Sequence, residues 1–106
     1  MNKTFQSFQD FIAFIDENYH FIPTAFKNGN HYNQAGENSG SCKVFSFARL
    51  HGLNAAQTLA GFAEHYQHVL ADPHGTGHAN IRHFMRHGWA GIQFDGEALH
   101  PKVEPA

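Results

Sequence analysis

The segment Phe5–Tyr19, FQSFQDFIAFIDENY, decides the fold that the sequence predicts. Its apolar residues recur three and four positions apart, as one face of an α-helix requires, at Phe5, Phe8, Ile12, Ile15 and Tyr19. Ser7, or Thr4 just before the pattern, would cap the start of this helix. Pro23 would end it. We therefore expect a well-buried helix at this end of the chain.

Three further segments show helical periodicity. We expect helices over Ser41–His51, over Asn54–Leu70 and from Thr76 or Gly77 to Gly88. Asn54 and Gln57 have the spacing of a capping box, and Gly88 is typical of a helix C-terminus. The apolar alternation over residues 44–47 also suits a strand, so a strand is the alternative for that part of the second helix.

The segment between the first two helices, residues 24–40, has no regular period. Asn and Gly residues are interleaved along it, and Asn favours successive turns because its side chain bonds nearby backbone and tolerates left-handed conformations. Phe26, Tyr32 and Ala35 would pin this long loop to the core. After the last helix, Trp89–Gly96 would form a brief strand or a buried strap.

The predicted fold class is therefore mainly α. A length of 106 residues and a hydrophobic content of 42% suit one domain with one core. We expect a compact single domain over residues 1–99, with about four helices, a long Asn/Gly-rich loop and a short C-terminal strap or strand. Residues 100–106 would form a flexible tail.

Composition argues against several classes of protein. The net charge is −2 and the seven Lys and Arg are scattered, so the sequence does not predict nucleic-acid binding. The single cysteine, Cys42, cannot form an intramolecular disulfide. No run approaches the ~20 apolar residues of a membrane span, and no signal-peptide core follows Met1. We expect a cytoplasmic protein without a membrane partner.

Cys42 is a candidate nucleophile because it lies at the start of a predicted helix, where backbone N–H groups and the helix dipole favour a thiolate. An enzyme of this kind would need a base, and His78 is the candidate. The competing and favoured interpretation is that a lone cysteine in a helix is a small buried hydrophobic residue.

The surrounding residues Ser39–Lys43 support a second hypothesis. A Gly- and Ser-rich turn that enters a helix and is followed by Lys43 presents backbone donors and positive charge to an anion. Arg49 and Arg82 could add charge, although the glycine spacing is not that of a Walker loop. A plain capped helix start is the alternative.

The ten histidines raise the question of a metal. His83 and His87 would share a helix face, but they point away from the apolar face and lack the Glu of a zinc-protease motif. We expect no metal and no cofactor. His78 and Arg82 lie at the rim of the buried face with Asn80 nearby, where they could line a cleft or simply hold the preceding turn.

Several strings in this sequence are familiar in combination. They are Asn28-Gly29, Asn33, Ala35-Gly36, Asn38, Gly40-Ser41-Cys42-Lys43, Gln57-Thr58-Leu59, His78, Asn80-Ile81-Arg82, Gly88-Trp89, Gly91-Ile92 and Phe94. With them the chain resembles the HopJ family of type III effector-like proteins from about Glu17 to Leu99. The resemblance implies no established reaction.

The polar positions that match the family are Asn33, Asn38, Ser41, Cys42, Lys43, Gln57, His78, Asn80 and Arg82. Relatives often carry an acidic residue before the histidine, whereas this chain has Gly77, so no carboxylate there can orient His78. The family is named for proteins secreted by plant-pathogenic bacteria. Type III leaders are typically disordered, and an apolar helix is expected here from about Thr4, so we consider type III secretion less favoured than a cytoplasmic role.

The leading functional hypothesis is a small-molecule or anion-binding domain. Its site would lie where the segment Asn28–Lys43 meets the start of the fourth helix. Ser41 and backbone N–H groups would donate hydrogen bonds, Lys43 and Arg82 would supply charge, and Asn33, Asn38 and Asn80 would shape the site. The alternatives are an enzyme with Cys42 as nucleophile and His78 as base, and a protein-interaction module or secreted effector with a protein partner.

Overall fold

The structure, a computed structural model, describes residues 7–102 of the 106, and within them it is an α+β fold. The helices are α1 (Phe8–Asn18), α2 (Ser39–Leu50), α3 (Ala55–Ala60), α4 (Glu64–Ala71) and α5 (Ala79–His87), followed by a 3-10 turn at Gly88–Gly91. The strands are β1 (Tyr19–Phe21), β2 (Phe26–Asn28), β3 (His31–Asn33), β4 (Ile92–Phe94) and β5 (Leu99–Pro101). They form two antiparallel sheets, β1–β5 and β3–β2–β4. The prediction of a mainly α, all-helical fold is therefore wrong.

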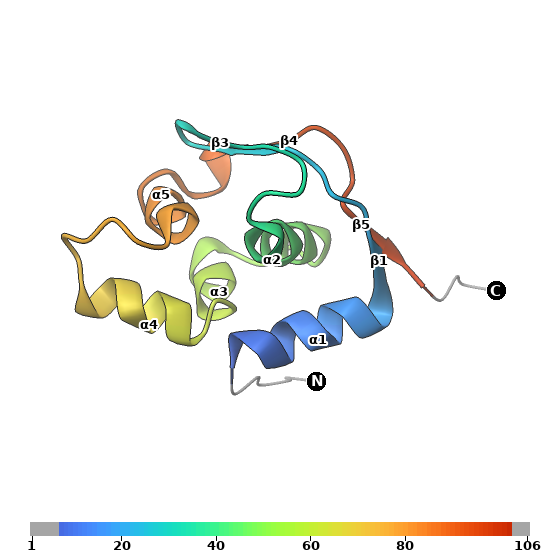
Figure 1. Cartoon of the computed structure of the whole chain (residues 1–106), viewed down its shortest axis with the longest axis horizontal. Helices are drawn as coiled ribbons and strands as arrows, with labels where there is room; N and C mark the ends of the chain where they lie inside the picture. Colours follow the sequence, from blue (N-terminus) through green and yellow to red (C-terminus); the bar gives the residue numbers. More distant parts are fainter. Residues whose placement is uncertain (1–6, 103–106) are drawn as a thin grey trace.

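Helix α2 lies at the centre of the molecule, with α1 on one side and the β3–β2–β4 sheet on the other (Figure 1). The side chain of Phe45, in the middle of α2, is fully buried. Its ring lies 5.9 Å from the ring of Phe26, 5.4 Å from Phe62, 5.0 Å from Phe84 and 6.4 Å from Trp89, between centroids. One aromatic side chain therefore joins the sheet, the α3–α4 junction and α5 to the central helix.

The ends of α1 show which sequence signals the chain uses. The Ser7 hydroxyl accepts a hydrogen bond from the Asp10 backbone N–H at 3.1 Å, so capping by Ser7 is confirmed. Phe5 and Thr4 lie outside the described residues. The helix ends at Asn18 and the chain enters β1 at once, so Pro23 is not what ends it.

The predicted helix over 54–70 is two helices. The capping box of Asn54 and Gln57 is confirmed at the start of α3, which ends at Ala60. The chain then comes so close to α1 that a Cβ at Gly61 would lie 2.7 Å from the Phe11 ring. Ala63 adopts a φ of 50° just before α4 begins. Close packing against α1 thus breaks a segment whose local pattern is helical throughout.

The segment 24–40, predicted to be a loop of turns, contains the hairpin β2–β3 around a turn at Gly29, whose φ is 61°. Phe26, Asn28 and Asn33 are fully buried, while Lys27 is exposed. The period-2 alternation of a strand is present, but asparagines occupy two of its inward positions. Because asparagine is polar, this alternation cannot be recognised in the sequence as the hydrophobic periodicity of a strand.

The C-terminal part of the chain completes both sheets. The strap predicted after α5 forms β4, which pairs with β2 with Phe26 opposite Phe94. His100 and Pro101, assigned to the flexible tail by the sequence, lie in β5 opposite β1. Residues 103–106 lie outside the described part of the chain.

Four asparagine side chains form one hydrogen-bonded network that joins the β2–β3 hairpin to the starts of α2 and α5. The Asn28 amide donates to the backbone oxygen of Asn80 at 2.8 Å and to its Oδ1 at 3.0 Å. Asn33 Oδ1 accepts from Asn80 Nδ2 at 2.9 Å and from Asn38 Nδ2 at 2.6 Å. Asn33 Nδ2 donates to Asn80 Oδ1 and to the Phe26 carbonyl. The network therefore ties the hairpin to the first residues of both α2 and α5.

We predict that Asn33→Ala lowers the free energy of unfolding by about 2–4 kcal/mol, because it leaves the buried Nδ2 group of Asn80 without its acceptor, removes the acceptor of the exposed Asn38 amide and opens a cavity. Urea unfolding followed by circular dichroism measures the change. Asn30→Ala, the same substitution at an exposed position of the same hairpin, is the matched control. Equal effects of the two substitutions would contradict a structural role for the network.

A second prediction concerns acid. Burial lowers the pKa of His83, and the charges of the neighbouring His31, Arg86 and His87 lower this pKa further. The His31 and His83 rings stack with their centroids 5.2 Å apart. The unfolded chain therefore binds a proton at His83 more readily than the folded chain, so stability falls as pH drops below the ordinary histidine pKa of about 6.5.

Urea midpoints measured from pH 7.5 to 5 should fall less steeply for His83→Gln than for the wild type. Glu64, whose pKa is lowered from 4.5, acts below this range. His74→Gln changes an exposed histidine in the α4–α5 turn and should keep the wild-type slope. A His83→Gln slope as steep as that of the wild type would refute the assignment.

Candidate functional site

A pocket of about 220 Å³ opens where α2, α4 and α5 begin. Its lining residues are Phe8, Asn38, Gly40, Ser41, Phe62, His65, His78 and Ile81. Phe8, Phe62 and Ile81 are buried, and the first two rings stack with their centroids 5.9 Å apart. The pocket therefore has an apolar wall made of core residues and a polar wall made of helix starts and imidazoles.

All three non-glycine residues with positive φ in the described part of the chain lie at these helix starts. Asn38 (φ 50°) precedes α2, Ala63 (φ 50°) precedes α4 and His78 (φ 57°) precedes α5. None of the three makes a side-chain cap hydrogen bond. Such backbone conformations cost free energy and tend to occur at functional sites.

The start of α4 differs from the other two because an acid occupies it. Glu64 accepts a hydrogen bond from the Phe8 backbone N–H at 2.8 Å. This hydrogen bond, the one from its own N–H and the charges of His65 and His68 lower the pKa of the Glu64 carboxyl. The first turns of α2 and α5 contain no acidic residue, so the positive ends of these two helices are not neutralised by a side chain.

Two imidazoles line the pocket and a third lies beside them. The rings of His65 and His78 are 4.9 Å apart between centroids, and His68 lies 5.9 Å from His78. Burial lowers the pKa of His78, and the charges of His65, His68 and Arg82 lower it further. His65 Nδ1 is buried and has no hydrogen-bond partner among the described residues.

The structure brings together three of the predicted site residues. Asn38, Ser41 and His78 all line the pocket, although the first two are 37 and more positions from the third in the sequence. Asn33 and Asn80 do not line it. They lie buried behind it, where Asn33 accepts the hydrogen bond of the Asn38 amide.

The two predicted cations do not line this pocket. The Lys43 ammonium forms an ion pair with Asp16 at 2.8 Å and lies over the Phe21 ring at 4.9 Å, so it points towards α1 and β1. Arg82 Nε donates to the Gly77 carbonyl at 2.6 Å and so holds the turn before α5. The backbone of the helix starts therefore supplies the donors that line the pocket, while Arg82 acts on it only through its charge near His78.

Cys42 lies in the core. Its side chain is 1% exposed, and its thiol contacts the Thr24 carbonyl at 3.6 Å. Burial raises the pKa of the thiol, which disfavours the thiolate that a nucleophile requires. Cys42 is also absent from the pocket that holds His78. The arrangement does not favour Cys42 and His78 as a catalytic pair.

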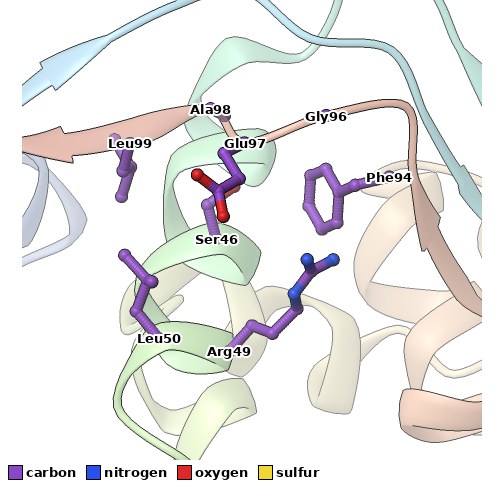
Figure 2. A pocket seen from close by; sticks show the side chains of 8 residues that line it. All are labelled: Ser46, Arg49, Leu50, Phe94, Gly96, Glu97, Ala98 and Leu99. Atoms are coloured by element: carbon purple, nitrogen blue, oxygen red, sulfur yellow. The ribbon is translucent and has the colours of Figure 1, made fainter.

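A second, smaller pocket of about 40 Å³ lies between α2 and the segment that leads into β5. Figure 2 shows Glu97 above Ser46, with the Arg49 side chain extending towards Phe94. The Arg49 guanidinium lies 5.3 Å from the centre of that ring. The volume suits about one water molecule, which could serve the buried Ser46 hydroxyl beside Cys42. We therefore regard the larger pocket as the candidate site.

Comparison with known proteins gives the family. The model of the family described as HopJ type III effector protein matches residues 1–99. The chain belongs to this family. A solved structure titled as the unknown function protein VPA0580 is similar, with a TM-score of 0.89 and 48% sequence identity over 91% of this chain and 81% of that chain. No curated protein matches.

This HopJ family member shows, in its described residues, no helix long and apolar enough to cross a membrane. Its family membership agrees with the resemblance in the sequence. Neither the family description nor the similar structure supplies an activity for the pocket, because the solved structure is itself titled as of unknown function.

Sequence reasoning missed half of the lining of this HopJ pocket. The missed residues are Phe8, Phe62, His65 and Ile81 on the wall, with His68 and Glu64 beside it. The spacing of His65 and His68, three apart, is visible in the sequence, but by itself it does not lead us to expect a metal. The third imidazole, from His78, joins them only because the chain reverses between α4 and α5 (Figure 1).

We predict that the Cys42 thiol is protected from alkylation in the folded protein. Iodoacetamide should react with it at least about 100-fold more slowly in buffer than in 8 M urea at pH 8, because the folded thiol is buried and its pKa is raised. A folded-state rate with a midpoint below the free-thiol pKa of about 8.5 would instead reveal an exposed thiolate and revive the enzyme hypothesis.

Proposed function

We propose that this HopJ family member is a binding protein for a small organic anion, which it holds in the pocket where α2 and α5 begin. One observation carries the proposal. Two helices start at the same pocket, each after a left-handed residue whose side chain provides no cap, and neither has an acidic residue in its first turn.

The electrostatic argument follows from helix geometry. The first N–H groups of a helix have no intrahelical partner, and in α2 the first helical bond runs from the Cys42 N–H to the Asn38 carbonyl. Gly40 and Ser41, which precede Cys42 in this first turn, line the pocket. Together with the helix dipole, such donors form a binding site for a carboxylate or phosphate group.

The apolar wall limits what the rest of the ligand can be. Phe8, Phe62 and Ile81 line the same pocket as the polar helix starts and give it a hydrophobic surface. A volume of about 220 Å³ is below the range of roughly 300–1,000 Å³ that is usual for drug-sized ligands. The proposed ligand is therefore small, with one anionic group and a compact apolar body.

The other functional hypotheses receive less support. An enzyme using Cys42 requires a thiol that the core buries. The exposed large hydrophobic residues Ile22, Tyr32, Leu50, Leu70 and Met85 each lie on a different segment, so no single helix or strand concentrates them. A protein partner stays a prediction. The cellular location also stays a prediction, and we favour the cytoplasm over type III secretion.

We predict that benzoate, as a carboxylate with a compact apolar body, binds with millimolar or better affinity at pH 7.5 in EDTA. Isothermal titration calorimetry and thermal shift measure it. Ser41→Asp places a negative charge in the pocket and should weaken binding at least about tenfold through charge repulsion. The added acid in the first turn of α2 should not reduce stability.

Ser39→Asp is the matched control, because it adds the same charge to the same helix start at a residue outside the pocket lining. It should weaken benzoate binding about threefold or less. Absence of wild-type binding to both benzoate and inorganic phosphate would overturn the proposal. Equal losses in the two variants would show that the anion does not bind at Ser41.

A further inference from the structure

Three histidines at and beside the pocket come close to the geometry of a metal site. His65 and His68 lie on one face of α4, and His78 precedes α5. Each offers one ring nitrogen, and the three nitrogens all lie within 4.8 Å of one another. No other group of three histidine, cysteine, aspartate or glutamate side chains within residues 7–102 meets this condition.

We propose that His65, His68 and His78 bind one zinc ion. Imidazole nitrogen is a preferred zinc ligand, and three histidines with an open fourth position form a known type of zinc coordination. Nitrogens around a tetrahedral zinc at 2.0–2.1 Å stand roughly 3.4 Å apart. The site therefore needs to contract slightly, and the exposed side chains of His68 and His78 are free of hydrogen bonds that would oppose this within the described residues.

A second observation at the same place supports the proposal. His65 Nδ1 is buried and has no hydrogen-bond partner in the described part of the chain. Buried polar atoms in folded proteins almost always have a partner, so an exception suggests that something is missing from the site. His83 Nδ1 is also buried without a partner, but only at His65 do two further imidazole nitrogens converge on the same place. A metal ion bound at His65 Nδ1 would supply the partner.

The surrounding charge is compatible with a cation. The Glu64 carboxylate interacts electrostatically with both His65 and His68 and adds a negative charge next to the cluster. Arg82 lies on the other side, where it interacts with His78 but is held by the Gly77 carbonyl. The charges of the Glu64 carboxylate and the Arg82 guanidinium oppose each other, so zinc binding depends mainly on the three neutral imidazoles.

The remaining histidine cluster provides an internal contrast. The rings of His31 and His83 stack face to face, 6° from parallel, and those of His83 and His87 stack at 16°. Their nitrogens do not converge on one point as a set of three. His83 and His87 nevertheless have the i, i+4 spacing that binds metals adventitiously on an exposed helix, so they form the natural control.

This proposal does not rest on the anion of the proposed function, because the metal is measured alone. Zinc affinity is determined by competition with a chromophoric chelator, and cobalt absorption bands report tetrahedral coordination. The wild type should bind one zinc ion per chain with submicromolar affinity. His68→Gln removes one exposed ligand and should weaken binding at least about 30-fold and abolish the tetrahedral cobalt bands.

His74→Gln and His87→Gln are the matched controls and should change zinc affinity less than about threefold. His78→Asn keeps a residue that tolerates the left-handed backbone and should behave like His68→Gln. Circular dichroism checks that each variant is folded. Wild-type affinity in His68→Gln, or a loss in His87→Gln equal to that in His68→Gln, would overturn the site and indicate adventitious binding.

Discussion

The carboxamide of Asn33 is the group on which the arrangement of this fold depends. It lies in the interior with no exposed surface, so each of its donors and acceptors needs a partner inside the protein. Those partners belong to Phe26 in the neighbouring strand β2, to Asn38 just before α2 and to Asn80 in α5, the last of which is 47 positions away in the sequence. Satisfying one side chain therefore fixes the hairpin, the start of α2 and the start of α5 relative to one another.

The same constraint explains why the pocket is polar. The Asn38 side chain, whose oxygen could have accepted a capping hydrogen bond from α2, makes no such bond; its Nδ2 donates inward to Asn33 Oδ1, and the residue has a left-handed backbone. The N–H groups of Gly40 and Ser41 consequently remain next to the pocket without an asparagine cap. The orientation of the Asn38 side chain thus gives both the interior hydrogen bond and the uncapped start of α2. The site is therefore already formed in the absence of ligand.

The helices that pack through regular apolar faces could be predicted from the sequence. The Ser7 cap, the capping box of Asn54 and Gln57 and the Gly88 terminus are all local signals, and the structure uses them. The hairpin could not be predicted because its inward positions are asparagines, whose usual preference is for turns. No local pattern shows which polar residues share the pocket, because that depends on chain reversals. The sequence indicated Ser41 and His78 as site residues, but it could not show that Lys43 points towards Asp16 instead of the pocket.

The proposed anion and the proposed metal would act on each other through charge. The starts of α2 and α5 already bring positive potential to the polar wall of the pocket, and a zinc ion at His65, His68 and His78 would add two charges beside them. Glu64 offsets part of that charge, and its carboxyl is engaged by the Phe8 N–H. An anion in the pocket would offset the rest, so metal and anion should each raise the affinity for the other, by the same factor in both directions. Because the two sites share imidazoles and one small volume, a ligand that also coordinates the ion would gain both interactions at once.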